Sequence, residues 1–177
     1  MKLYRLVTLA IAAAPLIYVP VTAQTGTGKP ATGGTQTAKP APAGAAAAKG
    51  AVRTIDIVGT DQMKYDLTEI PAKRGEQLRV RLTSKGTMPK IAMAHNWVLL
   101  KLGTSQVKFI TAGAQSRQTD FIPEEMKGQV IAKTALAGAG ETVEVTFKAP
   151  GAAGKYPYVC TFPGHFQAGM RGTLNVN

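Results

Sequence analysis

The stretch Cys160-Thr-Phe-Pro-Gly-His165-Phe-Gln-Ala-Gly-Met170 places a thiol, an imidazole and a thioether in eleven residues. Four residues separate each donor from the next, and this cysteine is the only one in the 177-residue chain. The other of the two histidines, His95, lies upstream in Met93-Ala-His-Asn-Trp-Val-Leu. A thiolate, two imidazoles and a weak axial thioether form the donor set of a blue-copper site. The sequence therefore predicts that these four side chains meet at one copper ion.

The neighbours of these donors fit the same interpretation. Asn96 and Thr161 each follow a donor, and we expect both to form hydrogen bonds that brace the loop carrying the thiolate. Pro163 and Gly164 supply a rigid turn and a position that is free to adopt a positive φ. The carbonyl oxygen of Ala94 is a candidate weak ligand on the second axial side. Taken singly, the cysteine also fits a small buried hydrophobe, and only the spacing of the donors favours metal binding.

Alternating hydrophobic residues predict that most of the remaining chain forms strands. In Gln77-Leu-Arg-Val-Arg-Leu-Thr, every second residue is apolar, which indicates a half-buried strand. We expect further strands at residues 53–58, 95–101, 142–148, 155–160 and 172–177. Short strands separated by Gly and Pro predict an all-β sandwich or barrel. Between residues 103 and 127 the alternation lapses, and we expect an insertion with a helical turn or two that covers one side of the sandwich.

The first 23 residues have the pattern of a secretory signal peptide. Lys2 and Arg5 precede an apolar stretch at residues 6–14, and Val21-Thr-Ala23 resembles the small-residue pattern before a cleavage site. The alternative is a retained membrane anchor, because residues 6–23 are about the minimum length that spans a bilayer. Both alternatives predict a protein outside the cytoplasm, in the periplasm of a bacterium.

Two further segments follow, a linker and a folded domain. Residues 24–50 are rich in Gly, Pro, Ala, Thr and Lys and contain no large apolar residue, so we expect a disordered linker. Residues 51–177 carry the strand pattern and the metal donors, and we expect them to form a single domain.

The chain is basic, with 21 Lys and Arg residues against 10 Asp and Glu residues and a formal net charge of +11. Residues 51–177 contain 16 of the basic residues and all 10 acidic ones, which leaves +6 on the domain. Such a surface favours acidic partners or anionic membrane surfaces. The basic residues are scattered singly, without a dense run or an aromatic RNA-binding motif, so we predict no nucleic-acid binding.

From about residue 55 to residue 176 the chain resembles azurin and the auracyanins. The matching runs are Gly59-Thr-Asp-Gln-Met-Lys-Tyr, Met93-Ala-His-Asn-Trp-Val-Leu, Val130-Ile-Ala-Lys-Thr with Gly138-Ala-Gly-Glu141, and Cys160-Thr-Phe-Pro-Gly-His165 with Met170-Arg-Gly-Thr-Leu. The resemblance implies a cupredoxin fold, which is a Greek-key sandwich of about eight strands with a helical flap. It also implies one type 1 copper ion and one-electron shuttling. The ligands that it implies are His95, Cys160, His165 and Met170, with a weak carbonyl from Ala94.

The chain departs from azurin at three points. Four residues separate His165 from Met170, as in auracyanin and plastocyanin, whereas azurin has three. Ala94 stands where azurin has glycine, and its methyl group affects how closely the carbonyl approaches copper. The single cysteine leaves azurin's disulfide without a counterpart. An apolar N-terminal segment followed by a low-complexity linker resembles the auracyanin layout, which implies a protein tethered at or near a membrane.

Three functions remain open at this stage. The first is a blue-copper electron carrier, not an enzyme, that serves partners such as cytochromes or oxidases in a respiratory or photosynthetic chain. We expect transient docking near His165, with the edge of its ring near the surface inside an apolar rim drawn from Met88, Pro89, Ile91, Met93, Phe162 and Phe166. The second is a periplasmic copper-binding or trafficking protein without a redox partner. The third is an enzyme that uses Cys160 and His165 for nucleophilic catalysis, for which the sequence offers no persuasive orienting group or oxyanion site.

Overall fold

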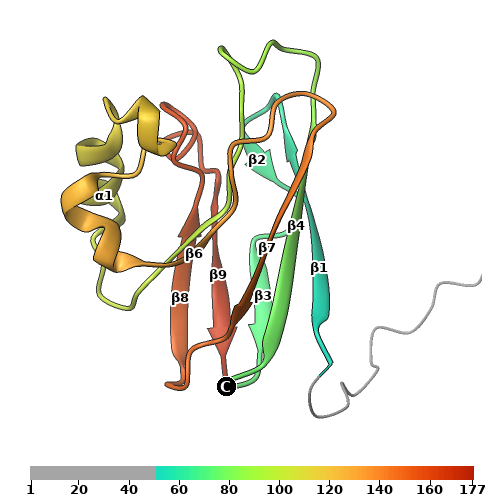
Figure 1. Cartoon of the computed structure of the whole chain (residues 1–177), viewed down its shortest axis with the longest axis vertical. Helices are drawn as coiled ribbons and strands as arrows, with labels where there is room; N and C mark the ends of the chain where they lie inside the picture. The colour runs from blue at the N-terminus through green and yellow to red at the C-terminus, as the bar shows by residue number, and fades with distance from the viewer. Residues whose placement is uncertain (1–50) are drawn as a thin grey trace, which may run out of the picture. The chain divides into compact units, whose positions relative to one another are not determined.

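Residues 51–177 are the part of the chain that the computed structural model describes, and they form nine strands in two sheets (Figure 1). The predicted signal or anchor segment, residues 1–23, and the predicted linker, residues 24–50, lie outside the described residues. Within the described part, the predicted all-β sandwich is confirmed.

The first sheet consists, in spatial order, of β2 (Lys64–Tyr65), β1 (Arg53–Thr60), β4 (Gln77–Lys85) and β7 (Thr142–Lys148). β1 runs parallel to β4, whereas β2 and β7 are antiparallel to their neighbours. The alternation predicted for β4 is present, because Leu78, Val80 and Leu82 are fully buried between exposed polar residues. This sheet therefore covers the core with one apolar face.

The second sheet consists, in spatial order, of β3 (Glu69–Ala72), β9 (Arg171–Val176), β8 (Gly154–Val159), β5 (Val98–Leu100) and β6 (Val130–Lys133). The main core fills the space between the two sheets and includes the large buried side chains of Trp97, Tyr158 and Leu174. The nine strands agree with the prediction of about eight. β2 and β3 are only two and four residues long, which is too short for alternation to be recognised in the sequence.

The predicted insertion is a helical flap between β5 and β6. It contains α1 (Gln106–Gly113) and two 3₁₀ turns, η1 (Arg117–Thr119) and η2 (Glu124–Gln129). Ser105 caps α1, because its hydroxyl accepts a hydrogen bond from the backbone N–H of Lys108 at 3.4 Å. Phe109 and Ile110 of α1 pack with Val159 in a second apolar cluster, so the flap covers the outer face of the second sheet. Within residues 51–177, no helix is long and apolar enough to cross a membrane.

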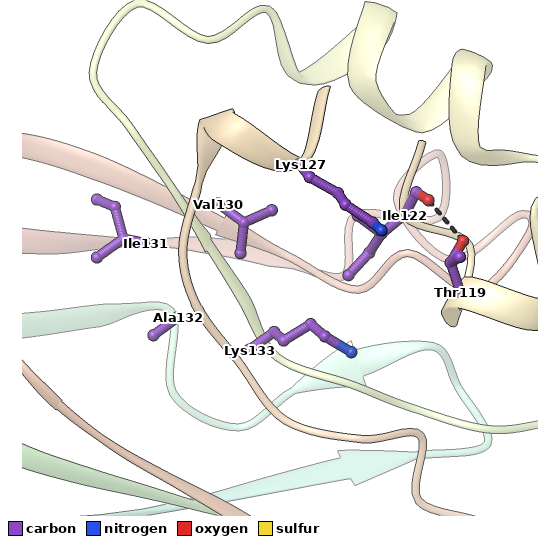
Figure 2. A pocket seen from close by; sticks show the side chains of 7 residues that line it. All are labelled: Thr119, Ile122, Lys127, Val130, Ile131, Ala132 and Lys133. Atoms are coloured by element: carbon purple, nitrogen blue, oxygen red, sulfur yellow. Dashed lines mark hydrogen bonds between the residues drawn. The ribbon is translucent and has the colours of Figure 1, made fainter. Parts of the chain in front are cut away.

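A pocket of about 470 Å³ lies where the flap meets β6 (Figure 2). Its lining residues are Thr119, Ile122, Lys127, Val130, Ile131, Ala132 and Lys133. Both lysines are ion-paired, Lys133 with Asp120 at 3.1 Å and Lys127 with Glu124. The positive charges beside this pocket are therefore already neutralised by acidic residues of the flap.

The stability of the fold is expected to depend on pH through Glu76, at the turn between β3 and β4. Its carboxylate accepts hydrogen bonds from Nε of Arg53 at 2.7 Å and from the backbone N–H of Lys73 at 2.8 Å. The bond from Arg53 lowers the pKa of Glu76 below its usual value. The carboxylate therefore adds stability above its unfolded-state pKa of about 4.3, and this stability is lost as the pH falls through the lower folded-state pKa.

Accordingly, we expect Glu76→Gln to lower the free energy of unfolding by about 2 kcal/mol near pH 7 and by much less near pH 2.5. Urea denaturation at the two pH values measures the difference. Glu144→Gln, at an exposed position of β7, serves as the control and should change little at either pH. An equal loss for Glu76→Gln at both pH values would contradict the role of the charge.

Candidate metal centre

Three of the donor side chains predicted from the sequence lie together in the interior, at one end of the sandwich. Sγ of Cys160 is 3.4 Å from Nδ1 of His165, which is in turn 3.2 Å from Nδ1 of His95. The potential ligand atoms of the three residues all lie within 4.8 Å of one another. His95 and Cys160 are fully buried, and His165 is 2% exposed. One thiol and two imidazoles thus surround a common point that water does not reach.

The loop that follows β8 carries Cys160, His165 and Met170, and backbone hydrogen bonds hold it closed. The backbone N–H of Cys160 donates to the carbonyl of Met170 at 3.1 Å, and the N–H of Met170 donates to the carbonyl of His165 at 2.9 Å. Gly164 and Gly169 have φ values of 85° and 97°, which a residue with a Cβ rarely adopts. The turn predicted at Pro163-Gly164 is present, and the glycines allow the chain to reverse within the loop.

A short bridge to another loop fixes His95. Its backbone N–H donates to the carbonyl of Ala137 at 2.9 Å, and its carbonyl accepts from the N–H of Ala137 at 2.7 Å. The carbonyl oxygen of the preceding residue, Ala94, lies 4.0 Å from Sγ of Cys160. The candidate weak ligand is therefore next to the donor cluster.

Met170 is fully buried, and its position beside His95 depends on Gly59 near the end of β1. A Cβ on Gly59 would lie 3.0 Å from Cε of Met170 and 2.9 Å from Cδ2 of His95. Both side chains therefore pack against the bare backbone of this glycine. The role of Gly59 was not predicted, although a glycine inside a strand is a recognised sign of a close approach.

The side chain of Asn96 joins the segment of His95 to the segment of Cys160. Its Oδ1 accepts from the backbone N–H of Thr161 at 2.9 Å, and its Nδ2 donates to Oγ1 of Thr161 at 2.7 Å. The Thr161 hydroxyl donates in turn to the carbonyl of Asp120 in the flap at 2.6 Å. The hydrogen bonds predicted for Asn96 and Thr161 are thus present, and they also attach the flap to the metal centre.

Tyr65 of β2 holds Asn96 from the other side. Its hydroxyl donates to the backbone carbonyl of Asn96, and the phenol is almost completely buried. The ring packs against Tyr158, with centroids 5.7 Å apart, and Tyr158 packs against Trp97 at 5.4 Å. The role of Tyr65 was not predicted, because β2 is too short to recognise in the sequence and nothing local links a tyrosine to a carbonyl 31 residues away.

Aromatic side chains cover His165. The ring of Phe162 lies 4.8 Å from the His165 ring and packs edge-on against Phe121 of the flap at 5.3 Å. His165 itself is 2% exposed, and the position of its ring edge near the surface stays a prediction. Of the six rim candidates, Met88 is 45% and Ile91 is 70% exposed, whereas Phe162 and Phe166 are buried.

The electrostatics of the cluster suit a transition metal. Burial lowers the pKa of His95, and burial together with the neighbouring His95 lowers the pKa of His165 to about 4. Both imidazoles are therefore neutral near pH 7, which is the form that binds a metal. Burial raises the pKa of the Cys160 thiol to about 12, so a bound metal has to displace its proton. A thiolate with two imidazoles suits copper and does not suit magnesium, calcium or manganese, and the residues present thus fit a copper ion.

Comparisons relate the described domain to copper proteins. A family model described as copper binding proteins of the plastocyanin/azurin family matches residues 52–177. Auracyanin-A of Chloroflexus aurantiacus is 36% identical over 119 residues, which span 66% of this chain and 69% of that protein. Azurin-1 of Alcaligenes xylosoxydans xylosoxydans is 38% identical over 126 residues, which span 70% of this chain and 96% of that protein.

A solved structure shows the same relationship. Auracyanin A, described as a "blue" copper protein of Chloroflexus aurantiacus, matches with a TM-score of 0.63 and 35% identity over 72% of this chain and 100% of that one. The predicted resemblance to azurin and auracyanin and the predicted copper cofactor are therefore confirmed.

Removing the Tyr65 hydroxyl is expected to destabilise the protein, because Tyr65→Phe leaves the buried carbonyl of Asn96 without its donor. We expect the free energy of unfolding of the metal-free protein to fall by about 1–3 kcal/mol, measured by chemical denaturation. Tyr158→Phe is the matched control: its hydroxyl also donates to a backbone carbonyl, that of Leu67 at 2.7 Å. Leu67 is only partly buried, so water can replace the lost donor and the loss should be smaller. A loss for Tyr65→Phe no larger than that of the control would contradict this account.

Proposed function

The chain belongs to the plastocyanin/azurin family of copper-binding proteins, and we propose that it carries single electrons between redox proteins through one type 1 copper centre. When bound, copper supplies the electron transfer by alternating between Cu(I) and Cu(II). The observation that carries the proposal is the buried cluster of one thiol sulfur and two Nδ1 atoms within 4.8 Å of one another.

We propose His95, Cys160 and His165 as the three strong ligands and Met170 as the weak axial ligand. Support for Met170 comes from its burial and from its packing with His95 against Gly59. The carbonyl of Ala94 is the proposed weak ligand on the second axial side, since it lies next to Sγ of Cys160. Asn96 and Thr161 are proposed to hold the Cys160 backbone, through the two hydrogen bonds between them.

The scaffold around the donors suits electron transfer, because it restrains them in one arrangement. Cys160 and Met170 are tied together by backbone hydrogen bonds, and His95 is tied to Ala137. Donors that move little between the two oxidation states lower the reorganisation energy of electron transfer. A pocket without water also prevents side reactions. Copper trafficking is the less favoured function, because delivery of the ion requires donors that a partner can reach, and these are buried.

Docking of a redox partner is proposed to occur over the apolar loop between β4 and β5. Met88 and Ile91 are exposed there, and the buried ring of Phe162 packs against the ring of His165. A small apolar patch suits a weak complex that separates quickly after transfer. Cytochromes or oxidases are the proposed class of partner. An electron carrier of this kind is not an enzyme, since it transforms no substrate.

The position of the protein outside the cytoplasm remains a proposal from the sequence. Residues 1–23 are proposed to act as a signal peptide or a membrane anchor, and residues 24–50 as a linker to the domain at residues 51–177. Basic residues before an apolar stretch support the first assignment, and the absence of large apolar residues supports the second.

Addition of Cu(II) to the purified metal-free protein tests the proposed function. We expect one equivalent to produce an intense blue absorption band, because the thiolate of Cys160 binds the ion directly. Cys160→Ser should still fold but should lose the band, since a hydroxyl does not replace the thiolate. Binding of copper without intense visible absorption would reject the electron carrier and favour a trafficking protein.

Replacement of Met170 by leucine tests the axial ligand. A thioether donates weakly to the oxidised ion, so its loss favours Cu(I), and we expect Met170→Leu to keep the blue colour but raise the reduction potential. Voltammetry measures the shift. Met126→Leu, which changes a partly buried methionine of the flap, is the control and should leave the potential unchanged. An unchanged potential in Met170→Leu would show that Met170 is not axial.

A further inference from the structure

Four exposed basic residues gather at the end of the sandwich opposite the metal donors. Lys73 and Arg74 lie in the turn between β3 and β4, Lys148 ends β7, and Lys155 lies near the start of β8. We refer to these four residues as the basic pole. In Figure 1 the turn between β3 and β4, the end of β7 and the start of β8 lie at the lower end, where the C-terminus lies, and the loop between β8 and β9 lies at the upper end.

Backbone contacts bring these segments of the chain together. The N–H of Gly75 donates to the carbonyl of Ala149 at 3.2 Å, and the N–H of Arg74 donates to the carbonyl of Asn177 at 3.3 Å. A Cβ on Gly75 would lie 3.2 Å from Cε of Lys148. Lys155 pairs with Asn175 in the ladder between β8 and β9. These contacts place the four residues of the basic pole at the same end of the sandwich.

The charges of the basic pole are not neutralised by neighbours. Among the residues that the structure describes, none of its four side chains forms a salt bridge. Glu76 lies in the same turn, but its carboxylate is paired with Arg53 at 2.7 Å. By contrast, Lys90 near the metal end is paired with Glu141, and both lysines of the flap pocket are paired as well. Within residues 51–177, the basic pole thus presents four exposed cations that have no ion-pair partner.

The chain also enters the sandwich at this end. β1 begins at Arg53, whose guanidinium donates to the carbonyl of Pro71 at 2.6 Å as well as to Glu76. The sequence before β1 contains five basic residues and no acidic one, and it includes the apolar stretch of residues 6–23. A segment with affinity for a membrane would therefore be joined to the domain beside the basic pole.

We propose that the basic pole docks on an anionic lipid surface and that this contact points the metal centre away from the membrane. Along β4, the nine residues from Gln77 to Lys85 place the two ends about 26 Å apart. A domain that stands on its basic pole therefore presents Met88 and Ile91 to the aqueous phase, where a redox protein can approach. The lipid contact itself requires no copper, so it stands or falls separately from the proposed electron transfer.

The expected strength follows from the number of charges. Each basic residue near an anionic bilayer strengthens binding about fivefold, and the effect is screened within about 10 Å at an ionic strength of 0.1 M. Four such residues on one face are therefore expected to make the domain prefer anionic over neutral lipid, and dissolved salt should weaken this preference. Four charges spread over the whole domain cannot contact a flat surface together.

Sedimentation with lipid vesicles tests the proposal on the full chain without copper. Binding to neutral phosphatidylcholine vesicles gives the baseline set by the N-terminal segment. The ratio of binding to vesicles with about one third phosphatidylglycerol over binding to these neutral vesicles isolates the effect of charge. In the variant Lys73→Gln/Arg74→Gln/Lys148→Gln/Lys155→Gln we expect this ratio to fall at least about tenfold at low salt. The control Lys85→Gln/Lys108→Gln/Arg117→Gln/Lys127→Gln removes the same charge from the flap and from the end of β4 near the metal donors, and should lower this ratio less than about threefold.

The proposal is overturned if the basic-pole variant keeps the wild-type ratio of anionic to neutral vesicle binding. It is also overturned if this ratio falls equally in the basic-pole variant and in the control. The first outcome would favour an acidic protein as the occupant of this surface, and the second a nonspecific effect of net charge. Hydrogen exchange on anionic vesicles tests the orientation: we expect slower exchange of the amides at 73–76 and 148–155 and no change at 160–170. Protection of residues 160–170 instead would place the metal end on the membrane and would also overturn it.

Discussion

The pair of hydrogen bonds between the Asn96 side chain and Thr161 is the interaction on which the metal centre depends. It joins two segments 65 residues apart in the sequence, one with His95 and one with Cys160. The ladder between β5 and β8 ends just beside these two segments, so beyond it the Asn96 side chain sets how closely the two loops approach each other. Hydrogen bonds in a dry interior are directional and strong, so they define the separation of the donors more closely than apolar contacts do.

The remaining contacts around the centre support that pair. The Tyr65 hydroxyl donates a hydrogen bond to the carbonyl of Asn96, and the backbone carbonyl of Asp120 accepts one from the Thr161 hydroxyl. Asp120 and Phe121 both have left-handed φ values, 58° and 60°, which cost free energy in residues other than glycine. This strain is located where the flap contacts both Thr161 and Phe162, so the flap takes part in positioning the loop of Cys160 as well as covering the second sheet.

The sequence predicts those features that are local. Spacing alone connects Cys160, His165 and Met170, because one loop closed by two glycines carries all three, and alternation identifies β4 because it spans nine residues. Several features that rest on contacts between distant segments are missed. β2 gives no periodicity in two residues, Tyr65 reaches a carbonyl 31 positions away, and the close approach at Gly59 exists only after His95 and Met170 have packed.

The two ends of the sandwich differ for a physical reason. At the metal end, polar groups are buried, and each needs a partner in the protein, so this end is built from loops that exchange hydrogen bonds with one another. At the opposite end the turns are short, and their long cationic side chains remain hydrated, which costs little because Lys and Arg keep their charged groups in water. Strands of eight and nine residues separate the ends. A charged surface at one end can therefore contact another body without disturbing the buried donors at the other.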